Sequence, residues 1–175
     1  WEGIYVGEWN THIVAHSNSK VIGMTTRKGD SLKALQNAMT QRNGLYDAGI
    51  IVSPSSGELI LSMYCPVFDT DGKTILGYVG GGPFVKELEK QLYNLKSEND
   101  TLRYYMVNTE TNMYIFADDS SLIATDIQDD MLLNIIDKIK SGETSGDLNY
   151  KKGSDSFVAS YQSIAEHGWA MVSYD

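Results

Sequence analysis

The stretch YVGEWNTHIVAHSN, residues 5–18, returns as a pattern in YMVNTETNMYIFAD, residues 105–118. Few identities survive, but both stretches read as a strand, a polar turn, a second strand and a short polar or acidic loop. A fixed internal period decides the number of folding units, and here it predicts two copies of one mixed unit. The correspondence continues without a gap, one hundred residues apart, at Ile22 and Leu122, Thr25 and Thr125, and Asp30 and Asp130. In the helix that follows, the apolar residues Leu32, Leu35 and Met39 correspond to Leu132, Ile135 and Ile139.

Charge is spread unevenly over the two copies. The chain of 175 residues carries a net charge of −9, which argues against nucleic acid and anionic membrane surfaces as partners. Residues 1–83 hold 6 Lys or Arg and 7 Asp or Glu, a net charge of −1, whereas residues 84–175 hold 8 and 16, a net charge of −8. We therefore expect the first copy to be the easier place to bind an anion.

Several kinds of site are missing from the sequence. Cys65 is the only cysteine, so there is neither an internal disulfide nor a thiolate metal site. There is no Gly-rich phosphate loop, no His–Glu metal helix, no nucleophile elbow, and no apolar run of ~18 or more residues. We expect no enzymatic activity, cofactor, metal or membrane span here. Because Trp1 already lies in a strand-like run, we also expect the chain to be part of a longer protein.

The first half of the chain predicts five strands and one helix. The helix at residues 31–40 has one apolar face, with Asp30 as its N-cap and Asn43-Gly44 at its end. Gly80-Gly81-Gly82-Pro83 then breaks the chain. The expected strands are residues 3–9, 12–17, 49–52, 58–67 and 74–79.

A linking helix and a shorter second half follow. Phe84, Leu88, Leu92 and Leu95 are spaced by three and four residues, which indicates a helix. The second half predicts a helix at residues 131–140, capped by Asp129 or Asp130, and strands at residues 102–107, 113–117, 148–151, 156–163 and 169–173.

The two halves together predict an α+β fold. The connections between the later strands of each half are too short for parallel crossovers, so both sheets should be antiparallel. We expect two tandem five-stranded units, residues 1–83 and 101–175, joined by a connecting helix in residues 84–100.

Three segments of the first unit resemble a known family. They are Met63-Tyr64-Cys65-Pro66-Val67, Asp69-Thr70-Asp71-Gly72-Lys73 and Ile75-Leu76-Gly77-Tyr78-Val79-Gly80. They resemble the core of a Cache sensor domain, which has a PAS-like sheet, and residues 3–23 fit the start of the same sheet. With the second copy, nearly the whole chain resembles a double Cache (dCache) module.

This resemblance implies a function. In that family the module is the extracytoplasmic part, extracellular or periplasmic, of a bacterial transmembrane receptor such as a chemoreceptor, sensor kinase or diguanylate cyclase. The family normally begins with a long helix leading out of the membrane. This sequence lacks that helix, so we expect membrane attachment only through flanking helices. The family usually binds a small organic ligand in the membrane-distal unit, here residues 1–83, and we expect a homodimer in the full-length receptor.

The loop between the first hairpin and the first helix carries Arg27. In a PAS-like unit this loop closes the pocket, and an arginine there can hold a ligand carboxylate through two parallel hydrogen bonds. The alternative is a solvated loop cation like its neighbour Lys28.

The first hairpin offers Trp9 and His16. Strand alternation places them opposite an apolar set made of Ile4, Val6, Ile13 and Ala15. Such a face can stack on and hydrogen-bond a small molecule, or it can be the wet side of an ordinary amphipathic hairpin.

Four further residues complete the predicted site. Ser62 and Tyr64 share one face of the long strand, and Tyr46 and Asp47 follow the helix where a pocket wall would be. Since phenol rings also occur in cores, a purely structural role is the alternative.

We therefore expect a sensing module with a pocket in the first unit. The second unit, whose loops are shorter, should have no pocket of comparable size. Two alternatives stay open. A spacer or dimerisation module that binds nothing would have its pocket filled by its own side chains, and a small hydrolase would use His16 with a nearby Ser or Asp.

The ligand class follows from three departures. Double Cache receptors for α-amino acids resemble one another in an aromatic pair after the Arg, an aromatic and an Asp on the next strand, and an Asp after the last strand. This sequence has Lys28-Gly29-Asp30-Ser31 in place of the aromatic pair. It has Ile51 and Ser53 in place of the aromatic residue and the Asp on the next strand, and Gly81 or Gly82 in place of the last Asp. A buried ammonium without a carboxylate partner is costly. We expect a ligand with a carboxylate or other acceptor and an apolar or ring portion under Trp9. Asp47 is the one nearby acid that could pair with the ammonium group of an amino acid and so allow it to bind.

Overall fold

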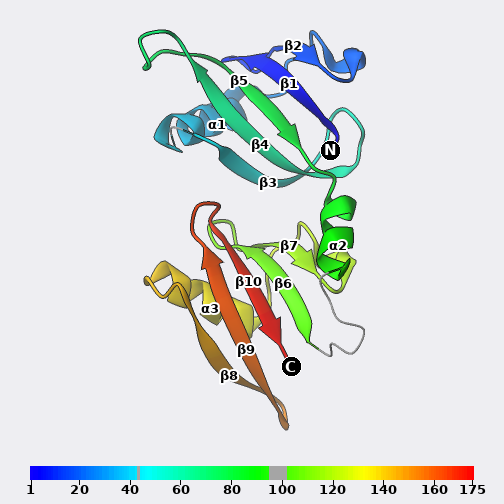
Figure 1. Ribbon diagram of the computed structural model, residues 1–175, viewed down its shortest axis with the longest axis vertical. Helices are drawn as coiled ribbons and strands as arrows, with labels where there is room; N and C mark the ends of the chain where they lie inside the picture. The colour runs from blue at the N-terminus through cyan, green and yellow to red at the C-terminus, as the bar shows by residue number, and fades with distance from the viewer. Residues whose placement is uncertain (43, 95–101) are drawn as a thin grey trace. The chain divides into compact units, whose positions relative to one another are not determined.

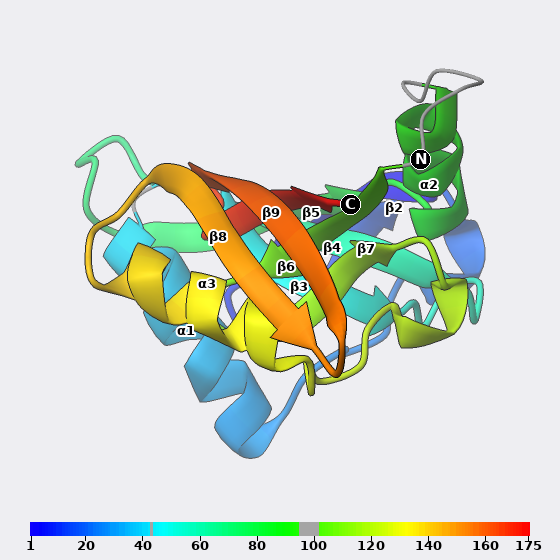
Figure 2. The same cartoon turned by 90° about the horizontal axis from the view of Figure 1, so that it is seen from below.

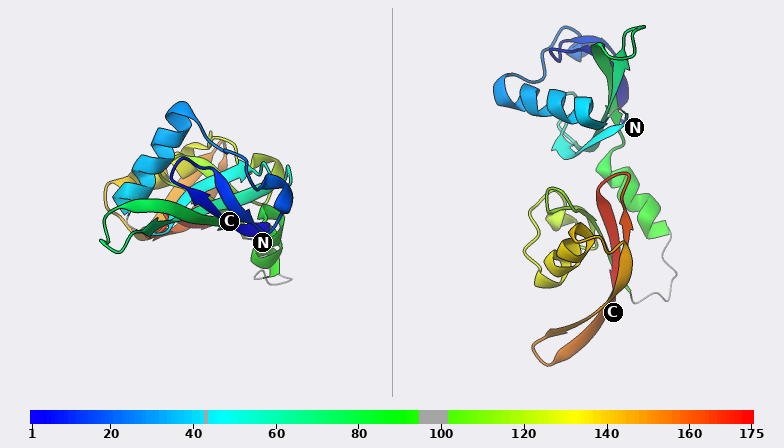
Figure 3. Two further views of the ribbon diagram at one scale, coloured as in Figure 1. Left: turned by 90° about the horizontal axis from the view of Figure 1, so that it is seen from above. Right: turned by 90° about the vertical axis from the view of Figure 1, so that its left-hand side faces the viewer.

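Two compact units, Trp1–Leu92 and Tyr93–Asp175, make up the chain. The structure is a computed structural model that describes residues 1–42, 44–94 and 102–175. Each unit contains a five-stranded antiparallel sheet and a helix that covers one face of it (Figures 1 and 3). The predicted α+β fold with two separate sheets is therefore confirmed. None of the helices within the described ranges has the length and hydrophobicity of a membrane span.

The first unit has the strand order β2-β1-β5-β4-β3. A 3-10 turn, Ser19–Val21, and the helix α1, Gly29–Arg42, fill the connection between the second and third strands. Asn43, predicted at the helix end, lies outside the described residues. The strands are β1 Gly3–Glu8, β2 Ile13–His16, β3 Tyr46–Val52, β4 Leu59–Phe68 and β5 Ile75–Gly82.

The second unit repeats this topology with the order β7-β6-β10-β9-β8. Figure 2 shows its long β8–β9 hairpin curving past the helix α3, Asp130–Lys140. The helix α2, Val85–Asn94, comes before it, and the predicted continuation of that helix to residue 100 lies outside the described residues. The strands are β6 Arg103–Asn108, β7 Met113–Ala117, β8 Ser145–Lys152, β9 Asp155–Ile164 and β10 Trp169–Tyr174.

A bulge in β2 changes which residues face the helix. Tyr5 pairs with His16 and Val6 with Ala15, but Gly7 pairs with Ile13, so one residue of β2 has no partner opposite. The bulge turns Ile13 to the side of His16, where it is only 1% exposed. The expectation that Ile13 lies opposite His16 was wrong because simple alternation does not cross a bulge. The rest of the expected apolar set faces outward, Ile4 being 63% exposed.

The two copies slip by one residue after their first turn. Three residues separate Glu8 from His12, which are joined by a backbone hydrogen bond, whereas four separate the paired Asn108 and Met113. The bond from Ile13 N to the Met24 carbonyl (2.8 Å) therefore recurs from Tyr114 N to the Thr125 carbonyl (3.1 Å), an offset of 101. The gap-free alignment was wrong in this loop because the second turn holds an extra residue.

The helix N-termini differ between the copies. Asp129 caps α3, since its Oδ1 accepts hydrogen bonds from the backbone N of Met131 (2.9 Å) and Leu132 (3.2 Å). This settles the choice between Asp129 and Asp130. In the first unit α1 begins at Gly29, so Asp30 lies within its first turn and is not the predicted cap.

The two cores differ in size. The second unit buries a large aliphatic cluster in which Leu132, Ile135 and Ile136 of α3 are all 0% exposed. The buried cluster of the first unit is small and partly aromatic: Leu35, Met39, Tyr64 and Tyr78. Close packing leaves few voids under α3, whereas the first unit keeps space between its sheet, its loops and the start of α1.

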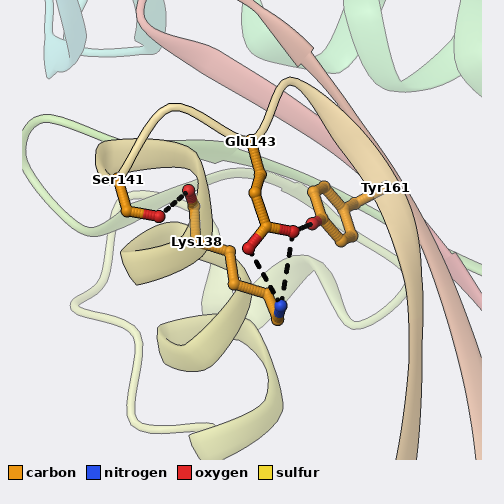
Figure 4. Close-up of polar contacts among 4 residues, drawn as sticks. All are labelled: Lys138, Ser141, Glu143 and Tyr161. Atoms are coloured by element: carbon orange, nitrogen blue, oxygen red, sulfur yellow. Dashed lines mark hydrogen bonds and ion pairs between the residues drawn. The ribbon is translucent and has the colours of Figure 1, made fainter.

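A polar network fastens the end of α3 to β9 (Figure 4). The Ser141 hydroxyl donates to the Lys138 carbonyl (2.7 Å), and Lys138 Nζ lies 3.1 and 3.3 Å from the two carboxylate oxygens of Glu143. The Tyr161 hydroxyl donates to the same carboxylate at 3.0 Å. Hydrogen bonds from Lys138 and then from Tyr161 lower the pKa of Glu143.

We predict that Glu143→Gln lowers the thermal midpoint at neutral pH by about 1–3 °C, because the exposed network is worth little. A lowered folded-state pKa stabilises the protein above the unfolded-state pKa, and this is lost as the pH falls through the folded-state value. Thermal melts from pH 7 down to about pH 3 should therefore converge for the two proteins. Glu166→Gln, at an exposed position, is the matched control, and a difference that persists at low pH would contradict the assignment.

Candidate ligand-binding site

A cavity of about 370 Å³ lies in the first unit. Its wall comes from β1, β2, residues 21–27, the first turn of α1, the end of β3 with the loop that follows, and β4. This volume is in the range of small-molecule sites. The cavity is open because residues 18–28 run beside the sheet as a loop and the core beneath α1 is small.

Thr11 fixes the backbone of Arg27 at the cavity wall. The Thr11 hydroxyl accepts a hydrogen bond from Arg27 N (3.0 Å) and donates one to the Arg27 carbonyl (3.1 Å). Thr11 is fully buried and has a φ of 65°, a conformation that costs energy for a β-branched residue. The turn is thus strained at a residue that holds the arginine loop in place.

The guanidinium of Arg27 lies against the phenol of Tyr64. Its Nη2 donates to the Tyr64 hydroxyl at 3.3 Å, and its Cζ is 5.8 Å from the centroid of the same ring. Burial lowers the pKa of Arg27, but the Tyr64 phenol offsets this and the pKa is raised overall. Arg27 is half-buried and forms no ion pair with any residue in the described ranges. A charged, half-buried guanidinium of this kind can receive an anion.

Glu2 brings a carboxylate to the same cavity. Its backbone N donates to the Gly82 carbonyl (3.0 Å), and its Oε1 accepts a hydrogen bond from the Ser53 hydroxyl. Asn18 Nδ2 donates to the Ser55 hydroxyl at 3.0 Å, so the loop after β3 is tied to both sides of the cavity. Sequence reasoning missed Glu2, and no local signal marks it, because only pairing beside β5 places it there.

The His16 ring is held in place by two contacts. Its Nδ1 accepts a hydrogen bond from Asn18 N at 2.7 Å. Its ring stacks on Tyr5 with centroids 5.1 Å apart and planes inclined by 16°. Within the described ranges, no hydrogen bond or ion pair joins this ring to a carboxylate.

Tyr5 and Tyr64 line the cavity, and the buried Tyr78 meets both of them edge to face. Burial raises the pKa of Tyr78 to about 12, and burial followed by the effect of Tyr64 raises the pKa of Tyr5 well above its ordinary range. Both phenols are therefore neutral at physiological pH. Their hydroxyls can donate as well as accept.

The structure brings three predicted site residues to the cavity, His16, Arg27 and Tyr64, and places four elsewhere. Trp9 packs against the small core, and its carbonyl accepts a bond from Gln36 Nε2 (2.9 Å), so it does not cover the cavity. Tyr46 stacks on Tyr64 from outside, with centroids 6.4 Å apart.

The other two, Asp47 and Ser62, are buried and do not line the cavity. Asp47 is 7% exposed, and its Oδ1 accepts a hydrogen bond from Gly49 N (2.7 Å). Ser62 is fully buried on β4, between the lining residues Ile60 and Tyr64.

A second cavity, of about 340 Å³, lies in the second unit. The expectation that this unit has no pocket of comparable size was therefore wrong. That expectation rested on the shorter loops of the second unit, and its aliphatic core does fill the space under the helix. The cavity lies instead beside the N-terminal end of α3, where Asp129 and Met131 meet aromatic residues of β8, β9 and β10. No group of three or more His, Cys, Asp or Glu residues in the described part of the chain is placed to hold a metal ion.

We predict that Thr11→Val destabilises the protein by about 1–3 kcal/mol, because it keeps the shape of threonine but leaves the buried polar groups of Arg27 without their partner. Urea denaturation measures this change. Thr26→Val, in the same loop, is the control. An equal effect of both variants would mean that the Thr11 hydroxyl has no special part in holding the loop.

Comparison with known proteins gives a match in structure and none in sequence. No protein-family model matches the chain, and no curated protein matches it. Among solved structures, an extracellular ligand-binding receptor from Desulfohalobium retbaense has a TM-score of 0.67 at 16% identity, covering 98% of this chain and 29% of that one.

Two further structures show the same likeness. The extracellular domain of the putative histidine kinase rpHK1S-Z16 has a TM-score of 0.71 at 12% identity, covering 98% of this chain and 68% of that one. The ligand-binding domain of the Pseudomonas aeruginosa amino acid chemoreceptor PctB, in complex with L-Gln, has a TM-score of 0.66 at 14% identity, covering 99% and 67%. The chain therefore has the double Cache-like fold of extracellular sensor domains.

Proposed function

We propose that this chain is the extracytoplasmic small-molecule-sensing module of a transmembrane signalling receptor, with its ligand bound in the first unit. The observation that carries the proposal is the cavity of about 370 Å³ that receives both Arg27 and Glu2. The fold supports it, since the structural neighbours are extracellular ligand-binding domains of receptors and kinases. Membrane attachment and a homodimer in the full-length receptor belong to the same proposal.

The ligand that suits this cavity is a small zwitterion. Arg27 can take a carboxylate, and Glu2 can take an ammonium, which removes the cost that made an amino acid seem unfavourable from the sequence. The apolar portion would meet Ile13, Val21 and Ile60, not Trp9. The complex of PctB with L-Gln supports an α-amino acid as the first class to test.

The geometry also suggests how binding could become a signal. Arg27 belongs to the loop held by Thr11, and Ser53, which donates to Glu2, belongs to the loop after β3. A ligand that joins Arg27 to Glu2 would favour one relative position of these loops. Such a shift needs a ligand that binds one state more tightly than the other.

Two alternatives fit less well. A spacer that binds nothing would have its cavity filled by its own side chains, whereas this one is open and lined by a guanidinium and a carboxylate. A hydrolase would need an acid to orient His16, and its Nδ1 instead receives the Asn18 backbone N–H.

We predict that Arg27→Ala weakens ligand binding by about 30-fold or more, because it leaves the ligand carboxylate without its partner. Isothermal titration calorimetry with α-amino acids measures this, after a thermal-shift screen of amino acids, amines and simple carboxylates has selected the ligand. Lys28→Ala, which removes the neighbouring exposed cation, is the matched control. Unchanged affinity in Arg27→Ala would remove this residue from the site.

We predict that Glu2→Gln weakens the binding of an α-amino acid by about 10-fold or more. The affinity for the analogue without the amino group should not change, because only the ammonium group needs the negative charge of Glu2. Titrating L-isoleucine and 3-methylpentanoate into the same preparations separates the two effects. Asp47→Asn is the control, because Asp47 lies outside the cavity. Loss of binding in Asp47→Asn with no change in Glu2→Gln would reverse the two assignments.

A further inference from the structure

The cavity of the second unit lies at the place that corresponds to the first site. In the first unit the cross-strand pair Ile51 and Ile60 lines the cavity, together with Ser31 in the first turn of α1. In the second unit the cross-strand pair Tyr150 and Phe157 lines it, together with Met131 in the first turn of α3. The internal repeat has thus produced two cavities beside equivalent edges of the two sheets and the starts of the two helices.

The walls of the two cavities differ in chemistry. The aliphatic pair of the first site is replaced by aromatic rings, and Tyr174 of β10 adds another. Phe157 and Tyr174 meet edge to face with centroids 6.3 Å apart. Tyr174 also stacks on Tyr105, with centroids 5.3 Å apart, planes inclined by 11° and hydroxyl oxygens 3.0 Å apart. These contacts fix the orientation of the rings at the cavity, and the π face of an aromatic ring attracts cations.

A fixed carboxylate lies at the same cavity. Asp129 is half-buried at the start of α3, and both of its hydrogen bonds to the helix end on Oδ1. Within the described part of the chain Oδ2 receives no hydrogen bond. Burial raises the pKa of Tyr114, and the charge of Asp129 raises it further, so this carboxylate acts on the aromatic cluster beside the cavity.

The remaining charges set the sign of the site. Asp175 adds a second carboxylate, and Arg103, which is exposed, adds one cation. Hydrogen bonding to the Tyr174 side chain is the first cause that raises the pKa of Arg103, and its guanidinium keeps its charge. Asp129, Asp175 and Arg103 together give the lining of this cavity a net charge of −1. Residues 93–175, which form this unit, hold 6 Lys or Arg and 14 Asp or Glu, a net charge of −8. Both values favour a small cation over an anion in this cavity.

We infer that the second unit contains a separate binding site for a small organic cation, whose ammonium group would lie between Asp129 and the rings of Tyr150, Phe157 and Tyr174. This inference does not depend on the ligand of the first unit. It gives the two halves of the chain different preferences, because the first cavity has a guanidinium and a carboxylate and the second has carboxylates with aromatic rings.

The test is an NMR titration of the whole chain with tetramethylammonium chloride, with tert-butanol as the neutral probe of similar size and sodium acetate as the anionic one. We expect saturable shifts with tetramethylammonium at the amides of residues 129–131, 150, 157 and 174, and none with the other two probes. Sodium chloride at matched concentration corrects for ionic strength. No saturable shift at these amides, or equal shifts with tert-butanol, would overturn the inference.

Two variants test the named groups separately. Asp129→Asn keeps a capping oxygen for α3 but removes the charge, and Phe157→Leu keeps an apolar side chain but removes a ring. Each variant should lower the affinity for tetramethylammonium about 5-fold or more, whereas Arg27→Gln in the first unit should leave that affinity unchanged. If Asp129→Asn titrates like the unaltered protein, the carboxylate has no part. If acetate binds and Arg103→Gln abolishes its binding, the cavity is an anion site and the inference is wrong.

Discussion

Two reciprocal pairs of tyrosine and glycine hold the centre of the first sheet. Across β1 and β5, Gly7 lies opposite Tyr78 and Gly80 lies opposite Tyr5. A Cβ at Gly7 would come within 2.4 Å of Cζ of Tyr78, and one at Gly80 within 2.5 Å of Cζ of Tyr5. Each phenol ring therefore covers the glycine opposite it, and only a residue without a side chain leaves that space.

The core and the site of the first unit both depend on these two rings. Tyr78 packs with Leu35 and Met39 under α1. Tyr5 stacks on His16 and meets Tyr64 edge to face, with centroids 6.5 Å apart, and Tyr64 in turn receives Arg27. The floor of the cavity is thus built from rings with few rotatable bonds, whereas Arg27 and Ser53 come from loops. A rigid floor under movable loops is a suitable arrangement for detecting a small molecule.

The second unit shows what the same topology becomes when the helix is aliphatic. Leu132, Ile135 and Ile136 fill the space under α3. The hydrogen bonds and ion pair among Lys138, Glu143 and Tyr161 join the C-terminal end of this helix to β9. The cavity that remains lies beside the start of the helix, as in the first unit, and its lining includes aromatic rings, two carboxylates and Arg103. One repeat has therefore produced two cavities with different chemistry, because the residues that line a cavity can change while the strand order does not.

The sequence by itself determined the number of units, the α+β class, the antiparallel sheets and the position of most strands, because period, turn residues and short connections act locally along the chain. It also pointed to His16, Arg27 and Tyr64, which lie around one cavity. The tertiary structure alone decided that Ile13 joins them and that Trp9 does not, since a bulge reverses alternation beyond it. It alone brought Glu2 to the cavity that Arg27 lines and gathered Asp129 with rings from three strands, because pairing between distant strands leaves no mark within either one.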